Sequence, residues 1–329
     1  MIGLPVAIVD PGSLIGRDVK AVLRERGFPS SHVHLFHTGS AEEGLLTDDE
    51  GEAAFVTPLD ADGLSGCAIA FLCGAPDATA RWVARRAPDG CLAIDLSGQR
   101  AGGTFVDAVR GALPQPLPAG DLFLLRDPAA TVLADAVAAL DTLGRVVAVT
   151  AAIDRPASEL GKDALDELFQ QAIAIASFRS VPKDHLGAQS AFNLFSPADT
   201  DAFDARVSED VRALLGRDLP VTVLSARAGV FHGTTLRLEA RFEGDAPRAD
   251  ALRDALLAAG RCFGEPDVDG PAGIVDASGH DETLVFRTAS AGGTSRLFLG
   301  SDHLRRPGAI LAVRIAEAAV SERGLLADA

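Results

Sequence analysis

No stretch of the sequence is apolar for long enough to cross a membrane, which takes about 20 residues. The first residues, MIGLPVAIVDPG, lack the basic segment of a secretion signal, so we expect a cytoplasmic protein. Lys and Arg number 30 against 46 Asp and Glu, and the net charge of −16 argues against nucleic acid or an anionic membrane as partner. The four cysteines have no metal-type or CxxC spacing, so we expect reduced thiols and no metal site.

The remaining composition is that of a globular α/β chain. Its 329 residues are 47% hydrophobic and include 33 Gly and 18 Pro, which suits two domains with many loops. In the first part, strands are predicted over 5–10, 32–37, 67–75, 91–98 and 120–127, and helices over 15–27, over 77–89 and from residue 128. This alternation predicts a parallel sheet whose ligands lie beyond the carboxyl ends of its strands.

After residue 144 the pattern changes to that of a mixed α+β unit. Strands are predicted over 144–154, in ETLVFRTAS and in SRLFLGSD, and helices over 162–178, 248–259 and 307–323. The stretch 221–243 alternates apolar and polar residues, which is typical of antiparallel strands with one face in water.

Several blocks stand in a recognisable order along nearly the whole chain. They are VAIVDPGSLIGRDVKAVLRERGFP, CAIAFLCGA, CLAIDLSG, GKDALDEL, AFNLFSP, SARAGVFHG and SDHLRRPGAILAVRIAE. In this order the chain resembles the aspartate-semialdehyde dehydrogenase family. The resemblance implies a doubly wound, Rossmann-type parallel-sheet domain over 1–128, completed by the C-terminal helix 304–329, and an α+β catalytic and dimerisation domain over 129–303.

Members of this family reduce aspartyl phosphate with NADPH in amino-acid biosynthesis. A cysteine in an Asn-Pro-x-Cys turn at a helix tip attacks the acyl phosphate, and a histidine seven residues after a substrate-binding arginine moves the protons. Here RDPAAT resembles that turn, and the cysteine position is Ala130. The arginine is Arg227, and the histidine position is Thr234. By this resemblance the catalytic cysteine and the catalytic histidine of the family are replaced by Ala130 and Thr234.

The cofactor turn also departs from the family. The Gly-x-x-Gly-x-x-Gly pattern reads Asp10-Pro11-Gly12-Ser13-Leu14-Ile15-Gly16, so only Gly16 is in register. Asp10 sets a carboxylate near the path of a pyrophosphate, and the 2′-phosphate region after the second strand keeps Ser40 without an arginine. The family implies NADP, but these residues make it a doubtful cofactor. A plain strand-to-helix turn and a weak nucleotide site both remain open.

The substrate pocket is partly kept. By the resemblance Arg227 holds a carboxylate, Arg206 and Asp210 stand for a Lys-x-x-x-Glu pattern on a helix, and Arg100 lies one residue from a phosphate-binding arginine. The family's glutamine after the VVAVT strand falls near 153–154 and is lost. These charges predict a pocket for a small anionic ligand, although solvated surface charges are the alternative.

Two functions follow from these residues. The first is a catalytically degenerate family member, a pseudoenzyme that serves as a dimeric binding or regulatory protein. The homodimer is implied by the family, and 221–243 agrees, because apolar residues on both of its faces call for helices on one and a partner on the other. The second is an active NAD(P)-dependent semialdehyde dehydrogenase or other oxidoreductase that uses Cys73 and His232.

Overall fold

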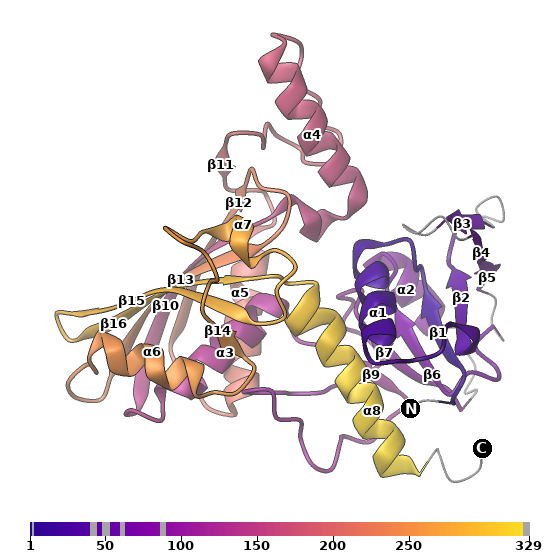
Figure 1. Ribbon diagram of the computed structural model, residues 1–329, viewed down its shortest axis with the longest axis horizontal. Coiled ribbons are helices and arrows are strands. Elements are labelled where there is room, and N and C mark those ends of the chain that lie inside the picture. Colours follow the sequence, from indigo (N-terminus) through magenta and orange to yellow (C-terminus); the bar gives the residue numbers. More distant parts are fainter. Residues whose placement is uncertain (2, 40–44, 48–52, 60–62, 86–89, 325–329) are drawn as a thin grey trace. The chain divides into compact units, whose positions relative to one another are not determined.

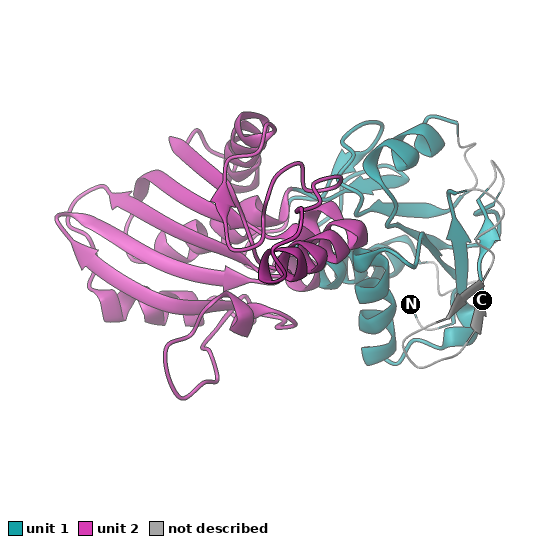
Figure 2. Cartoon of the chain, turned by 90° about the horizontal axis from the view of Figure 1, so that it is seen from above, with its two compact units in different colours: residues 1–107, 113–126, 308–329 teal, residues 108–112, 127–307 magenta. Residues whose placement is uncertain are grey.

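The computed structural model describes the chain except for residues 2, 40–44, 48–52, 60–62, 86–89 and 325–329. The chain divides into two compact units (Figure 2). Unit 1 comprises Met1–Asp107, Leu113–Arg126 and Gly308–Ala329, and unit 2 comprises Ala108–Ala112 and Asp127–Pro307.

Unit 1 is built on a seven-stranded sheet in which every neighbouring pair is parallel, in the order β5-β2-β1-β6-β7-β9-β8. Its strands are β1 (Val6–Val9), β2 (Val33–His37), β5 (Thr57–Pro58), β6 (Ile69–Leu72), β7 (Leu92–Asp95), β8 (Thr104–Phe105) and β9 (Leu122–Leu124), and β3 (Leu45–Thr47) and β4 (Ala53–Phe55) form a separate pair. Its helices are α1 (Leu14–Glu25), η1 (Ser30–His32), α2 (Pro76–Val83) and α8 (Leu311–Arg323).

The sequence of unit 1 explains its sheet. Every residue of β1, β6 and β7 is buried, as expected of parallel strands that helices cover on both faces. All five predicted strands are present, so the predicted doubly wound sheet is confirmed. The helix predicted over 77–89 ends earlier, at Val83. Helix α8 contacts α1, and an ion pair joins Arg26 to Glu317.

Unit 2 is built on a seven-stranded mixed sheet in the order β11-β12-β10-β13-β16-β15-β14. Its strands are β10 (Val146–Arg155), β11 (Leu194–Phe195), β12 (Val221–Ala228), β13 (Thr234–Phe242), β14 (Phe263–Gly264), β15 (Thr283–Ala291) and β16 (Thr294–Ser301). Its helices are α3 (Pro128–Leu140), η2 (Ala157–Leu160), α4 (Lys162–Ala176), α5 (Thr200–Leu215), α6 (Ala249–Leu257), α7 (Ile274–Ala277) and η3 (Arg305–Ile310).

The stretch 221–243 forms two strands that alternate between the buried and the exposed face, as predicted. Its two strands, β12 and β13, do not pair with each other, because β10 lies between them. Strand β12 runs parallel to β10, and β13 runs antiparallel to it. Alternation of apolar and polar residues indicates which face a side chain takes, but it carries no information about the neighbouring strand.

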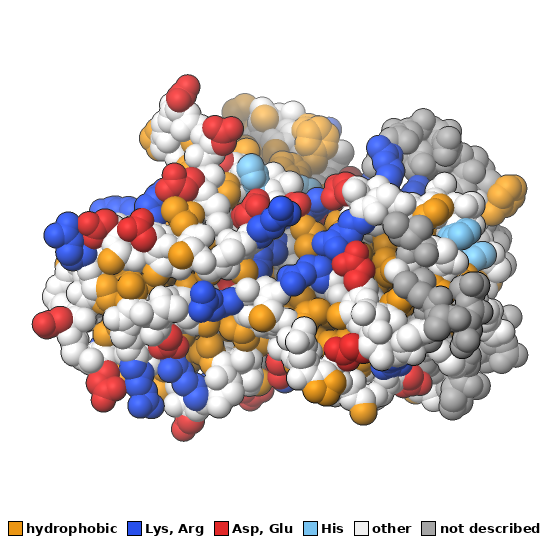
Figure 3. Space-filling model, turned by 60° about the horizontal axis from the view of Figure 1, so that its bottom comes forward, with side chains coloured by type: hydrophobic (Ala, Val, Ile, Leu, Met, Phe, Trp, Pro, Cys, Tyr) orange, Lys and Arg blue, Asp and Glu red, His pale blue; other side chains and the backbone are white. Residues whose placement is uncertain are grey.

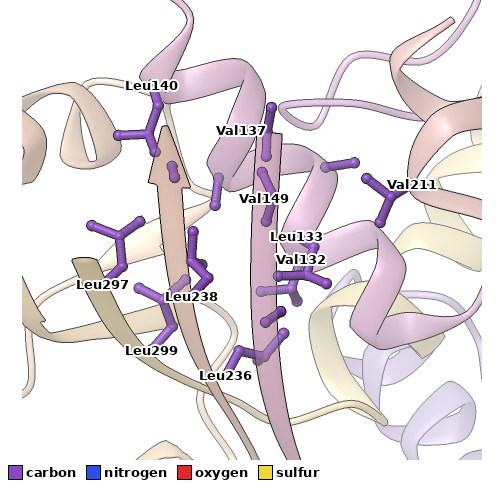
Figure 4. Packing of buried hydrophobic residues seen from close by; sticks show 14 of the residues in the cluster. Val132, Leu133, Val137, Leu140, Val149, Val211, Leu236, Leu238, Leu297 and Leu299 are labelled. Carbon is purple, nitrogen blue, oxygen red and sulfur yellow. The ribbon is translucent and has the colours of Figure 1, made fainter. Parts of the chain in front are cut away.

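One face of the unit 2 sheet carries the core. Helix α3 is buried along most of its length and contacts β10 and β13, while α5 packs on β12 and α6 on β15. Figure 4 shows Val132, Leu133 and Val137 of α3 lying over the strands that carry Val149 and Leu236. Small alanines between these residues let the helix approach the sheet closely.

The opposite face of the sheet has a different surface. Val221 and Val223 of β12 are 8% exposed on the core side, whereas Leu224, which follows Val223 and points to the other face, is 69% exposed. Charged residues of β13 and β16 join Leu224 there, including Glu239 and Arg296, which form an ion pair. Over the part of the surface that Figure 3 shows, basic side chains likewise lie among acidic ones.

Helix α4 extends away from the sheet (Figure 1). It packs on a small separate cluster that includes Ala164, Leu168 and Leu186. The buried carboxylate of Glu167 accepts hydrogen bonds from the backbone N–H groups of His185 and Leu186, at 2.7 and 3.0 Å. The excursion from α4 to β11 is therefore held by polar contacts as much as by apolar ones.

Candidate functional site

The tip of helix α3 carries no reactive group. Asp127 is the N-cap, and its carboxylate accepts a hydrogen bond from Ala129 N at 3.0 Å. Ala130 follows in the first turn and is 0% exposed. The hydroxyl of Thr131 donates to the backbone oxygen of Asp127 at 3.2 Å, so it is used within the helix. A methyl group thus stands at the position for which the sequence predicted a lost cysteine.

Two predicted pocket residues support this helix start. Arg206 and Asp210 both lie on α5, as the sequence predicted. Asp210 is fully buried and accepts a hydrogen bond from Asp127 N at 3.0 Å, while Arg206 Nη2 lies 3.2 Å from the Asp127 carboxylate. Burial raises the pKa of Asp127, and the charge of Arg206 opposes that rise. Both residues are therefore engaged by Asp127.

Arg227 lies deep in unit 2, with 1% exposure. Its Nη1 donates to the backbone oxygen of Pro156 at 2.7 Å and lies 3.6 Å from Glu159 Oε2. Burial lowers the pKa of Arg227, although the nearby charge of Glu159 opposes this. Arg227, for which the resemblance predicts a substrate carboxylate as partner, thus has a carboxylate of the chain itself beside it.

Arg155 is a residue of this site that the sequence reasoning missed. It is paired with Arg227 across β10 and β12 and is 4% exposed. Its Nε donates to Glu159 at 2.7 Å, its Nη2 donates to Asp199 at 3.0 Å, and its guanidinium carbon lies 3.9 Å from the ring centre of Phe203. The available signal was the strand periodicity, which places Arg155 on the same buried face as Ile153.

Thr234 and His303 complete the buried polar group. Thr234 begins β13, is 3% exposed and lies opposite Ser301 of β16. Its hydroxyl and both ring nitrogens of His303 have no hydrogen-bond partner within the described part of the chain. Burial lowers the pKa of His303 to about 4. The charges of Asp302 and Asp127 oppose this shift, and those of His232 and Arg227 add to it. His303 is therefore neutral at pH 7.

The position predicted for His232 needs correction. The sequence placed it within the strand pattern of 221–243, but β13 begins only at Thr234. His232 lies in the preceding turn and is half-buried. The alternation of apolar and polar residues over 221–243 did not reveal the break between β12 and β13 in which His232 lies.

The side chain of Asp10 occupies the predicted cofactor turn between β1 and α1 in unit 1. Asp10 has a φ of 58°, a conformation that Asp tolerates better than most residues. Its carboxylate accepts hydrogen bonds from the backbone N–H and the hydroxyl of Thr38, at 2.9 and 2.8 Å. A Cβ atom added to Gly74 would lie 2.2 Å from Asp10 Oδ2, so the carboxylate packs directly on that backbone.

The other turn residues serve the start of α1. The Ser13 hydroxyl caps the helix by accepting from Gly16 N at 3.0 Å, and Gly12 lies in the turn before it. Gly16 is required by packing, because a Cβ there would lie 2.6 Å from the backbone oxygen of Asp10. Ser40 lies outside the described residues. A dinucleotide phosphate would meet the Asp10 carboxylate and an already capped helix, so these residues do not fit NADP.

Cys73 lies at the carboxyl end of β6 and is 2% exposed. Burial raises the pKa of its thiol well above the ordinary value, and the charges of Asp95 and Asp10 raise it further. Burial also raises the pKa of Asp95 itself, to about 6. Cys73 is therefore a protonated, enclosed thiol, unsuited to nucleophilic attack.

Arg100 belongs to unit 1, whereas the arginines described above belong to unit 2. Its guanidinium carbon lies 4.7 Å from the ring centre of Phe105, on which Arg126 also stacks. Arg126 pairs with Asp107 at 2.7 Å. The described contacts of Arg100 thus include an aromatic face in its own unit.

No family model matches the sequence. Among curated proteins, the USG-1 protein homolog of Azotobacter vinelandii is 29% identical over 335 residues, which cover 97% of this chain and 98% of the relative. The USG-1 protein homolog of Pseudomonas aeruginosa is 29% identical over 338 residues, covering 95% and 97%. The aspartate-semialdehyde dehydrogenase of Rickettsia conorii is 23% identical over 343 residues, covering 95% and 96%.

Solved structures give the same result for the fold. A probable aspartate-semialdehyde dehydrogenase from Pseudomonas aeruginosa superposes with a TM-score of 0.82 at 26% identity, covering 95% of this chain and 97% of that one. Aspartate semialdehyde dehydrogenase II of Vibrio cholerae, complexed with ASA, superposes with a TM-score of 0.81 at 20% identity, covering 97% and 98%. By sequence over nearly its whole length and by fold, the chain belongs to the aspartate-semialdehyde dehydrogenase family.

Proposed function

We propose that this chain is a homodimeric member of its family that has lost the thiol-based reaction and acts as a binding or regulatory protein. The observation that carries the proposal is Ala130, a fully buried methyl group in the first turn of α3. A methyl group forms no covalent intermediate, and losing a covalent nucleophile costs several orders of magnitude in rate.

No described neighbour supplies the missing chemistry. The Thr131 hydroxyl is hydrogen-bonded within its own helix, and Thr234 has no base as partner. His303 is neutral, with a pKa of about 4, so it is a weak base at pH 7. The burial of Cys73 and the raised pKa of its thiol count against the alternative of a rearranged oxidoreductase.

The cofactor is proposed to be lost together with the nucleophile. NADP-dependent reduction requires the pyrophosphate to approach the turn between β1 and α1, where the Asp10–Thr38 hydrogen bonds lie. We therefore expect NADP to bind weakly or not at all. The described part of the chain contains no helix that is both long and apolar enough to span a membrane.

The homodimer is proposed on the open face of the unit 2 sheet. Leu224 is 69% exposed at the centre of β12, and Phe192 and Leu194 beside the sheet are 79% and 57% exposed. Phe192 and Leu194, together with Phe298 and Arg237, line a hollow of about 560 Å³ on this face. A second copy of the chain would remove these apolar side chains from water, in keeping with the dimerisation role of the corresponding domain in the family.

Two variants test the proposal. Phosphate-dependent oxidation of aspartate semialdehyde by the purified protein should be undetectable, and so should that of a matched control, Ala134→Cys, which puts a thiol elsewhere on α3. Adding Ala130→Cys and Thr234→His together tests whether the rest of the pocket still works. Turnover by the wild-type protein within about tenfold of an ordinary family member would refute the proposal.

A further inference from the structure

Two arginines lie side by side in the interior of unit 2. Arg155 and Arg227 are register partners on the parallel strands β10 and β12, so their backbones are about 4.8 Å apart, and both side chains point to the buried face. They are 4% and 1% exposed. Two buried charges of the same sign repel each other strongly, and such a pair persists only with an anion beside it.

The anion is Glu159. This residue lies on η2, which directly follows β10 and is held in place by hydrogen bonds from Ala157 N and Ser158 N to the backbone oxygens of Val230 and Phe231, both at 3.0 Å. Its Oε2 atom is 2.7 Å from Arg155 Nε and 3.6 Å from Arg227 Nη1. A single carboxylate oxygen is thus shared between two guanidinium groups.

The site retains donors that nothing uses. Arg155 Nη1 and the Ser158 hydroxyl are buried and have no hydrogen-bond partner in the described part of the chain. The other carboxylate on Arg155, that of Asp199, has a side chain that is 55% exposed and lies at the periphery. The interior therefore offers more donors than the Glu159 carboxylate satisfies.

We propose that Arg155 and Arg227 form a carboxylate-binding site and that the Glu159 side chain is its built-in occupant. The proposal goes beyond the loss of the nucleophile, because it names what fills the anion pocket and stands or falls independently of Ala130. A tethered carboxylate has an effective concentration in the millimolar range or above, so free carboxylates compete poorly with it. The ligand class of the emptied site is a small monocarboxylate.

Shortening the occupant tests this. In Glu159→Ala the two arginines lose their shared partner, so the midpoint of thermal unfolding should fall. Sodium formate or acetate should then raise the midpoint, and the rise should grow with the logarithm of the concentration above Kd and exceed that caused by sodium chloride. A tenfold excess over Kd corresponds to about 1.4 kcal/mol, or about 3–6 °C for a domain of this size.

Three controls make the result specific. Glu239→Ala removes a carboxylate from an exposed arginine pair on the same sheet, with Arg296 at 2.9 Å, and should gain nothing from formate. Glu159→Gln keeps the size of the occupant, so it should be less stable than the wild type and show no rescue. Adding Arg227→Gln to Glu159→Ala should abolish the rescue.

Equal effects of formate on Glu159→Ala and on Glu239→Ala would overturn the proposal. So would a Glu159→Gln variant as stable as the wild type, which decides the matter if Glu159→Ala does not fold. Activity of the wild-type protein toward aspartate semialdehyde would refute the proposed function, whereas the formate comparison tests the occupancy of the two arginines without any turnover. Rescue without any activity would support both.

Discussion

Replacing Asp10 tests whether its carboxylate prevents unit 1 from binding NADP. The Asp10 carboxylate accepts two hydrogen bonds from Thr38, at 2.9 and 2.8 Å. A hydrogen bond to a charged group contributes about 1.5–3 kcal/mol, and since both residues are half-buried we take the lower value, about 3 kcal/mol for the two. Against this, the φ of 58° costs a residue other than glycine about 1–2 kcal/mol, which Asp10→Gly recovers.

The expected net loss for Asp10→Gly is therefore about 1–2 kcal/mol, or roughly 2–8 °C in the midpoint of thermal unfolding. The same variant removes the carboxylate that packs on Gly74, so NADP should raise its midpoint more than it raises that of the wild type. Asp10→Asn is the matched control. Its amide can keep both hydrogen bonds to Thr38 without the charge, so its stability should change little and NADP should still be barred.

Thermal unfolding of the three proteins, with and without NADP, decides between these outcomes. A shift in the wild type as large as that in Asp10→Gly would refute the reasoning, because it would mean that Asp10 bars nothing. NADP binding by Asp10→Asn equal to that of Asp10→Gly would show that charge, and not occupied space, is the barrier.

Other predictions concern pH, packing and assembly. The pKa of His303 is about 4 in the folded chain and about 6.5 in the unfolded chain, so the unfolded chain binds the extra proton between these values. The free energy of unfolding of unit 2 should therefore fall by up to about 3 kcal/mol as pH falls from 6.5 to 4. Measured by unfolding at several pH values, this loss should be smaller in His303→Gln. The pKa of Asp95 is raised from 3.8 to about 6, so unit 1 should show the opposite slope, losing stability as pH rises through that range, and Asp95→Asn should flatten it. Leu236→Ala should lower the free energy of unfolding by about 2–5 kcal/mol in chemical denaturation, because this side chain is fully buried. Leu224→Ala should leave the stability of the monomer nearly unchanged and should weaken the dimer seen by light scattering. A dimer unaffected by Leu224→Ala, or a protein that is monomeric at micromolar concentration, would contradict the proposed interface.

The sheet of unit 1 was predictable because its strands are apolar throughout. Strands such as β6 and β7 read as buried runs whatever their neighbours are. Strands β5 and β8 have only two residues each, too few for any periodicity, and they were missed. The order of β12, β10 and β13 was not predictable, since it depends on contacts between segments that are distant in the sequence.

The candidate site was predictable only in part, for a similar reason. The order of the blocks placed Ala130, Thr234 and Arg227 without knowledge of their partners. The importance of Glu159 comes from the pairing of Arg155 with Arg227 across two strands, which a linear reading does not reveal. His303 was overlooked because its character comes from burial, and a histidine in a loop is usually exposed.

The excursion that begins with α4 has a consequence for amide hydrogen exchange. Its apolar cluster is small and separate from the main core, so this segment should open locally without unfolding of the sheet. The amides of His185 and Leu186 have the Glu167 carboxylate as acceptor, so their deuterium uptake should follow the fraying of α4 and not global unfolding. Slower uptake at these two amides on raising the protein concentration would report that a second chain holds the excursion closed.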